Sequence, residues 1–439
     1  MIIRHICGID IGSSKIAACL GCFRQRELVS LWRDSAAAAG IKAGQWQDVG
    51  GLTGVISKVL GNLKSKSGIK IKSVNLGINS QNIVAKHSQA VIALAEKDNR
   101  AVTKKDIQNV NQQALILGSC LEHEVLYAQP LSYTIDNENE VINPLGLYGH
   151  KLGVNLYLIC TRASYINTII EIINRLGLRI NEITLSGIAA SMAVFNYDKM
   201  KGLNILCDIG KDITQILIFN DDRLIHYQVM SSGGDNLTTS LSGELSIPYS
   251  LAEEIKISHG CIQNEVENLG LSSKIHPGRK RESETADKEI IVKKDNAYST
   301  LSQDLINQVI SCASRNMAES IRDAIRPHLL AMASVPLPAK ATLYVSGRTA
   351  CLDGFLELLE VVTGIPVKMA KIGNASLSTS LMLQGIVSGE PILNYLTCLG
   401  LIAKEINLSY RKSARPIYDL RSILTYIPEK IKQVYQEYF

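Results

Sequence analysis

The short motif Asp-Ile-Gly occurs twice in the chain, at 10–12 and at 208–210, each time between two apolar runs. Apolar runs of this kind predict β-strands, which places each motif in the tight turn of a hairpin. Successive backbone N–H groups of such a turn point outward and form a concave site for phosphate oxygens. Two copies of one phosphate-binding hairpin, far apart in the chain, predict a duplicated α/β fold that closes on a nucleotide.

The first turn contains each residue type that a phosphate site needs. Gly12 leaves the backbone open to close approach, and Ser13 and Ser14 add hydroxyl donors. Lys15 supplies positive charge, which strengthens hydrogen bonds to phosphate. We therefore expect this turn to bind phosphate groups.

The second turn repeats part of this pattern with Asp208 and Gly210, and Thr214 adds a hydroxyl nearby. One carboxylate per turn, from Asp10 and Asp208, suits a hydrated Mg²⁺ that bridges phosphates, because this ion keeps waters and accepts carboxylates. Further glycine turns follow at 233–234 and at Gly347, and we expect them to complete the site.

Composition limits the class of protein. With 439 residues and 46% hydrophobic content, the chain has room for two or more domains with cores of their own. A formal charge of +5 is a mild excess and argues against a dedicated nucleic-acid binder. Ten scattered cysteines fit a reducing compartment, and the N-terminus lacks the pattern of a signal peptide. We expect a cytosolic protein, or one attached to a membrane surface.

The order of predicted elements indicates how the domains are arranged. Consecutive strands are predicted at 3–11, 15–23 and 27–32, followed by a helix at 49–63. In residues 81–156 the pattern changes to short predicted strands on either side of one helix, which predicts a small inserted domain. The helix begins after an N-cap in Thr103-Lys104-Lys105-Asp106.

Later in the chain, residues 270–299 are polar and predict a solvated loop. A long helix is predicted from Gln303 to Arg326, ending at Pro327, and another at 352–363.

The end of the chain has one apolar helical face. Its members recur at helical spacing and are Ile431, Val434, Tyr435, Tyr438 and Phe439. Basic residues precede them, a combination that favours insertion into an anionic membrane surface. The alternative is a terminal helix that docks on the protein's own core.

The ordered set of motifs resembles the FtsA family of bacterial cell-division proteins, within the actin, DnaK and sugar-kinase superfamily. The resembling segments are 8–15, 129–136, 143–152, 233–235, 252–256 and 260–261. The most specific is Pro-Leu-Gly-Leu-Tyr-Gly at 144–149, which closes the inserted block. The resemblance covers nearly the whole chain.

The resemblance implies an actin-like, two-lobed fold, built as a duplicated ribonuclease H-like unit, with an inserted SHS2-type subdomain 1C and no subdomain 1B. The implied domains are 1–80 with 157–199 (1A), 81–156 (1C), 200–234 with 335–408 (2A), 235–334 (2B), and 409–439 as linker and membrane-targeting helix.

The resemblance also implies ATP and Mg²⁺ as cofactors. By matching position, Glu254 and Lys256 lie near the ribose and adenine, and Gly234 and Gly347 near the phosphates and the nucleoside. The full set of expected cofactor contacts is Asp10, Gly12, Ser13, Ser14, Lys15, Asp208, Gly210, Thr214, Gly233, Gly234, Glu254, Lys256, Gly347 and Arg348.

The sequence departs from the family pattern in both lobe II turns. Lys211, Asp212 and Ile213 follow Gly210, where the family usually has glycines, and Arg348 follows Gly347 in the nucleoside turn. The Asp212 charge repels a terminal phosphate unless Mg²⁺ or Lys211 compensates. We therefore expect a nucleotide clamp with at most weak ATPase activity.

Partners follow from the resemblance alone. They are a second copy of the chain, joined through 1C into filaments, the C-terminal tail of FtsZ, other divisome membrane proteins and the anionic inner face of the cell membrane at the division site. Near the expected FtsZ groove the chain has Ser311-Cys312-Ala313 in place of the usual Glu-Pro-Arg. Two alternatives remain, a small-molecule kinase of the same superfamily and a PilM-type pilus-assembly adaptor.

Overall fold

A computed structural model describes residues 3–24, 27–94, 99–262, 289–294, 297–333, 341–374, 377–378 and 392–403. The apolar runs of the first lobe form a five-stranded sheet in the order β13-β6-β1-β2-β3. Its strands are β1 (Ile3–Ile11), β2 (Lys15–Arg24), β3 (Glu27–Ala37), β6 (Ser73–Ile78) and β13 (Arg179–Leu185). The three strands and the helix predicted at the start of the chain are confirmed. Each predicted strand overlaps β1, β2 or β3, and the predicted helix lies within α1 (Val49–Ser67).

The second lobe repeats the first, strand for strand. Its sheet has the order β16-β15-β14-β19-β20. The strands are β14 (Leu203–Ile209), β15 (Thr214–Asn220), β16 (Arg223–Met230), β19 (Thr342–Ser346) and β20 (Val367–Met369). In both sheets the central strand pairs antiparallel with the next strand of its hairpin and parallel with a later strand. The predicted duplication is therefore confirmed, and it places the two Asp-Ile-Gly turns at equivalent strand ends.

Two short helices lie between the sheets. Helix α11 (Leu396–Ala403) packs on β1 and β2, helix α4 (Ser186–Val194) contacts β14 and β15, and the two helices cross. Every described side chain of both is buried. Leu206 and Leu217 of the second sheet join the core cluster of the first. The joint between the lobes is therefore packed as an interior.

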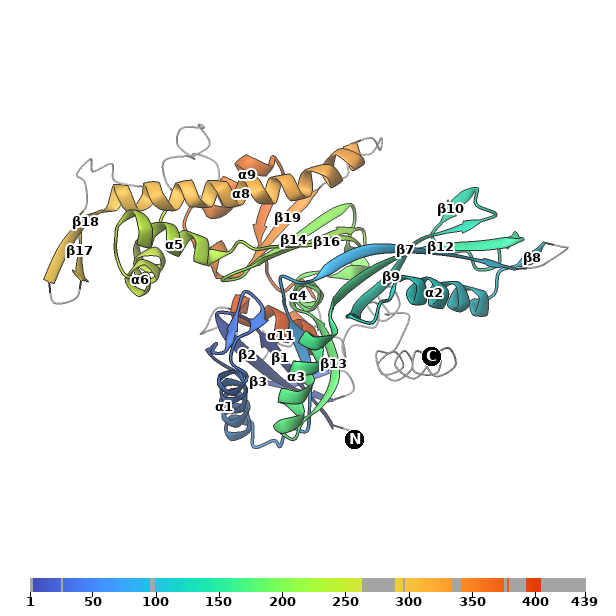
Figure 1. Cartoon of the computed structure of the whole chain (residues 1–439), viewed down its shortest axis with the longest axis horizontal. Helices are drawn as coiled ribbons and strands as arrows, with labels where there is room; N and C mark the ends of the chain where they lie inside the picture. The colour runs from blue at the N-terminus through green and yellow to red at the C-terminus, as the bar shows by residue number, and fades with distance from the viewer. Residues whose placement is uncertain are drawn as a thin grey trace.

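Longer helices cover the outer faces (Figure 1). α1 (Val49–Ser67) and α3 (Ala163–Arg175) lie on the first sheet, and α5 (Gly234–Glu244), α8 (Gln303–Ala333) and α9 (Phe355–Thr363) lie on the second. α6 (Tyr249–His259) packs beside α5 and α8. These helices form because one apolar stripe on each is buried against a sheet or a neighbouring helix.

The inserted block forms a separate sheet with its own core and projects from the body (Figure 1). The sheet order is β10-β9-β12-β7. Its elements are β7 (Val84–Ala93), β8 (Arg100–Ala101), α2 (Lys104–Gly118), β9 (His123–Ile135), β10 (Asn139–Val141), β11 (Tyr148–Gly149) and β12 (Lys151–Arg162). The predicted N-cap is confirmed, since Thr103 and Asp106 form a capping box at the start of α2.

Two sequence predictions are wrong in the second lobe. Helix α8 does not end at Pro327 but continues to Ala333. Proline removes one backbone donor, and the partly buried Leu329 beyond it continues the apolar face that α8 packs on the lobe II core. Part of the predicted loop at 270–299 is a hairpin of β17 (Glu289–Lys294) and β18 (Ala297–Ser302). The rest of that loop lies outside the described residues.

The predicted C-terminal membrane helix and its apolar residues also lie outside the described residues. Within the described part of the chain, no helix has the length and apolarity to cross a bilayer. The exact domain boundaries given above stay a prediction.

Candidate functional site

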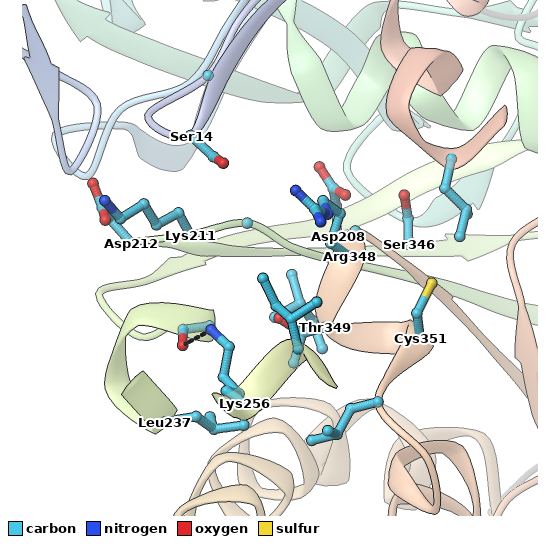
Figure 2. A pocket seen from close by; sticks show the side chains of 18 of the residues that line it. Ser14, Asp208, Lys211, Asp212, Leu237, Lys256, Ser346, Arg348, Thr349 and Cys351 are labelled. Atoms are coloured by element: carbon cyan, nitrogen blue, oxygen red, sulfur yellow. Dashed lines mark hydrogen bonds between the residues drawn. The ribbon is translucent and has the colours of Figure 1, made fainter. Parts of the chain in front are cut away.

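The two Asp-Ile-Gly turns face one another across a cavity of about 1370 Å³ between the lobes. Figure 2 shows side chains from both lobes, among them Ser14, Asp208 and Lys256, around this cavity. The sequence-predicted residues that line it are Asp10, Gly12, Ser13, Ser14, Lys15, Asp208, Gly210, Gly234, Lys256, Gly347 and Arg348. Folding thus brings together residues from segments far apart in the chain.

The two turns have the same backbone geometry. Gly12 N–H donates to the carbonyl of Lys15 at 3.1 Å, and Gly210 N–H donates to the carbonyl of Ile213 at 3.0 Å. The two hairpins therefore close with equivalent hydrogen bonds, and the residues between the bonded pairs line the cavity, namely Ser13, Ser14, Lys211 and Asp212. This is the arrangement that accepts anions.

An acidic pair lies at the floor of the cavity. Asp10 accepts a hydrogen bond from Ser186 Oγ at 2.8 Å. Loss of solvent raises the pKa of Asp10 to about 6, and the nearby Asp208 charge adds to this, while Ser186 and Lys15 oppose it. Burial also raises the pKa of Asp208, against the effect of Ser346 and Lys15. Two neighbouring carboxylates that are both shielded from water are costly to hold in their charged forms. A bound cation would stabilise those charged forms.

The donor set fits Mg²⁺ bound mainly through water and phosphate. Asp10 and Asp208 supply one carboxylate each, and no group of three or more potential metal ligands occurs among the residues that the structure describes. Mg²⁺ typically uses one or two carboxylates and keeps several waters, so it needs no fuller protein cage. Asn79 is a residue of the cavity wall, and its buried Oδ1 has no hydrogen-bond partner in the described chain. A buried polar atom without a protein partner is expected to bond to water or to a ligand.

Four cationic side chains reach the cavity, namely Lys15, Lys211, Lys256 and Arg348. Lys15 Nζ donates to Asn394 Oδ1, and its pKa is lowered mainly by burial, with a contribution from repulsion by Arg348. Lys256 Nζ donates to the carbonyl of Gly234 at 3.0 Å and to Glu253 at 2.6 Å. Lys15 and Arg348 come from opposite lobes, and an anion bound between them offsets their repulsion.

Glycines in the second lobe allow backbone segments to approach closely. Gly347 has φ +90, and a Cβ there would lie 1.9 Å from the carbonyl oxygen of Ile209. A Cβ on Gly233 would lie 2.3 Å from the carbonyl oxygen of Lys211. Gly234 N–H donates to the Gly210 carbonyl at 2.9 Å, which fixes the start of α5 on the second turn.

Three of the predicted contacts do not line the cavity. Thr214 is buried and its hydroxyl donates to the carbonyl of Ser232 at 2.7 Å. Gly233 packs behind the turn, and Glu254 is exposed, whereas the neighbouring Glu253 lies on the cavity wall.

Several site residues were not identified from the sequence. Ser186 begins α4 and contacts Asp10, and Asn394 contacts Lys15 from η3 (Ile392–Tyr395). Gln215 is fully buried and its Nε2 lies 3.4 Å from Asp208 Oδ2. A polar residue directly after Thr214 in an otherwise apolar strand is the signal for Gln215, whereas Ser186 and Asn394 carry no local signal.

Sequence comparison identifies the family. A family model described as "Cell division protein FtsA" matches residues 205–386, and "SHS2 domain inserted in FTSA" matches residues 80–160. The chain belongs to the FtsA family. FtsA of Pseudomonas aeruginosa is 24% identical over 369 residues, which covers 83% of this chain and 82% of that protein. FtsA of Escherichia coli K12 is 26% identical over 259 residues, covering 59% of this chain and 61% of that protein.

A structural comparison supports the fold independently. The structure described as "PilM-PilN type IV pilus biogenesis complex" is similar with a TM-score of 0.60 and 12% identity, covering 92% of this chain and 99% of that one. At this identity the likeness concerns the fold alone. The predicted actin-like fold with its inserted SHS2 subdomain is confirmed, and the SHS2 match covers most of the sheet that projects from the body of the molecule.

Proposed function

We propose that this FtsA-family chain is a cell-division adaptor that binds ATP and Mg²⁺ between its lobes. The observation that carries this proposal is the pair of equivalent turns facing one cavity, with Asp10 and Asp208 at its floor. A duplicated arrangement of this kind grips a polyphosphate from two sides, because each turn directs backbone donors at it.

We infer that different parts of the cavity wall take different parts of a nucleotide. Ser13, Ser14 and the backbone of the two turns take the phosphates. The wall that α6 and β19 contribute, with Lys256 and Gly347, takes the nucleoside. Bound Mg²⁺ would be held through water by Asp10 and Asp208, where it neutralises phosphate charge. Ser186 and Gln215 orient those two carboxylates.

A thermal unfolding experiment tests nucleotide binding. Ligands that bind the native state raise the melting temperature according to their concentration relative to Kd. We expect ATP with Mg²⁺ to stabilise the full chain, and Asp208→Asn to reduce that effect. The absence of stabilisation by ATP and by ADP, at concentrations up to millimolar, would contradict the proposal.

We further propose that residues 409–439 attach the protein to the cytoplasmic face of the cell membrane, where subdomain 1C supports self-association and a lobe II surface receives the FtsZ tail. Family membership and the apolar stripe of the tail support this. Sedimentation with anionic liposomes, comparing the full chain with one ending at Tyr418, tests the tail. Equal sedimentation of the two chains would exclude it as the anchor.

The alternatives have less support. A pilus-assembly adaptor shares the fold, yet the family matches name a cell-division protein. A small-molecule kinase needs a second substrate next to the phosphates. Two assays separate the adaptor from the kinase. An adaptor should form filaments that sediment in the presence of ATP and should transfer phosphate to none of the candidate small molecules, whereas a kinase should phosphorylate one of them.

A further inference from the structure

A small hairpin of the first lobe reaches the phosphate end of the cavity. Strands β4 (Ile41–Lys42) and β5 (Gln45–Trp46) pair antiparallel, and the turn residues Ala43 and Gly44 have φ values of 48 and 65. Residues with two successive positive φ values form the tight turn that two-residue hairpins prefer.

This hairpin is held firmly to the first lobe. The Trp46 ring stacks on Tyr165 with centroids 4.2 Å apart, and its Nε1 donates to the Tyr165 carbonyl at 3.0 Å. A Cβ on Gly44 would lie 2.5 Å from the carbonyl oxygen of Asn79, so the tip packs closely against the chain directly after β6. The position of the tip is therefore fixed by packing.

The tip contacts both phosphate turns. Gly44 N–H donates to Ser13 Oγ at 3.4 Å in the first turn, and Ala43 N–H donates to Asp212 Oδ2 at 2.5 Å in the second. Ser13, Gly44 and Asp212 all line the cavity. The Asp212 carboxylate of lobe II thus accepts a hydrogen bond from a backbone N–H of lobe I. This contact lies beside the two turns that we propose to bind phosphate.

No cationic side chain of the described chain pairs with Asp212. The nearest candidate by sequence, Lys211, has its ammonium 5.6 Å from the centre of the Tyr249 ring. Lys15 donates to Asn394 and Lys256 pairs with Glu253. The negative charge of Asp212 is therefore met by a backbone donor, as a bound phosphate would be.

We infer that Asp212 selects against nucleoside triphosphates by occupying the place of the terminal phosphate. The inference rests on the proposed nucleotide site. A third phosphate placed between the turns competes with Asp212 for the Ala43 N–H and meets its charge at short range. A diphosphate ends before this point and leaves the contact between Asp212 and Ala43 intact. The cleft therefore prefers ADP over ATP.

Binding of ATP and ADP to the full chain, measured by calorimetry with Mg²⁺ in excess, tests this inference. Asp212→Asn keeps the size and one acceptor oxygen but removes the charge, and Asp212→Gly removes the side chain in case the amide perturbs the turn. Asp323→Asn, on the exposed face of α8, removes a carboxylate charge away from the cavity and serves as the matched control.

We expect wild-type protein to bind ADP more tightly than ATP. Both Asp212 variants should bind ATP at least about tenfold more tightly than wild type, because like-charge juxtaposition is removed, with ADP affinity changed by less than about threefold. Asp323→Asn should bind as wild type does. Equal gains for ATP and ADP, or no gain, would overturn the inference while leaving nucleotide binding intact. Binding of neither nucleotide by any variant would overturn the proposed site and this inference with it.

Discussion

The crossing of helices α4 and α11 depends on Gly400. A Cβ on this residue would lie 1.6 Å from the carbonyl oxygen of Ala189 and 2.5 Å from its carbonyl carbon. These are backbone atoms of a fully buried helix, so no side chain can rotate to make room. Gly400→Ala therefore requires the two helices between the lobes to move apart.

The size of the effect follows from two opposing terms. An ordinary contact requires the backbones to separate by about 1.5 Å, and overpacking of this kind in a dense interior costs about 1–3 kcal/mol. Alanine in place of glycine inside a helix recovers about 1 kcal/mol. Since the Cβ is fixed rigidly to its own backbone and the atoms it meets are backbone, we take the upper end of the overpacking cost and expect a net loss of about 2 kcal/mol in the free energy of unfolding.

Urea unfolding of the full chain measures this difference. Gly61→Ala is the matched control, because Gly61 lies on an exposed face of helix α1 and a Cβ there would have no other atom within 4 Å. We expect the control to gain up to about 1 kcal/mol. If Gly400→Ala were as stable as Gly61→Ala, the close packing of α4 on α11 would be refuted.

Two further substitutions test the floor and rim of the cavity. Asp10→Asn should stabilise the protein without Mg²⁺, because the raised pKa means that wild-type protein loses stability as pH rises from 3.8 to about 6. The gain in the free energy of unfolding should be small at pH 4 and reach about 1–2 kcal/mol at pH 7, a value discounted for partial exposure of the side chain. An equal gain at both pH values in urea unfolding would show that the raised pKa is not its cause. Gly347→Ala should lower the free energy of unfolding by about 2–4 kcal/mol, since it adds a backbone clash at 1.9 Å to a positive φ. Gly364→Ala, with φ +70 and open space around it, should lose only about 1 kcal/mol, and equal losses in thermal or urea unfolding would count against the clash.

Local patterns in the sequence predicted most of the fold because each depends on neighbouring residues. The apolar runs around Asp10 and Asp208 form the predicted hairpins, and Thr103 caps the predicted helix. Pro327 misled the helix prediction because burial of a continuing apolar face, a tertiary effect, outweighs one lost backbone donor. Local propensity is a weak guide where tertiary packing decides.

The site was predictable only in part, for a related reason. Residues of the turns carry their own signal, since glycine and hydroxyl residues between apolar runs predict a phosphate turn. Ser186 and Asn394 reach the cavity from elements that are distant in the chain, and only the sheet topology brings them to Asp10 and Lys15. Asp212 was recognised as a charge near the phosphates, but its partner Ala43 comes from a hairpin of the other lobe that no motif marked.

Gln215 connects the cavity through hydrogen bonds to strand β12, at the part of that strand that packs in the core of the first lobe. Its Oε1 accepts from Gly187 N–H at 3.1 Å and from Tyr227 Oη at 2.8 Å. Tyr227 N–H in turn donates to Tyr157 Oη, on β12 of the inserted sheet, at 2.7 Å. Both contacts of Tyr227 are buried, so loss of either partner leaves a polar group unsatisfied at a cost of about 1–3 kcal/mol.

A double-mutant cycle tests whether these contacts form one unit. We expect Gln215→Leu and Tyr157→Phe each to destabilise the protein, because each removes one partner of Tyr227. Since the two positions share that partner, the double variant should lose less than the sum of the single losses, by at least about 0.5 kcal/mol. Strict additivity in urea unfolding would mean that Tyr227 transmits nothing between the cavity and β12. A measured coupling would give the cavity an energetic connection to β12, the strand that joins the first lobe to the subdomain that we propose for self-association.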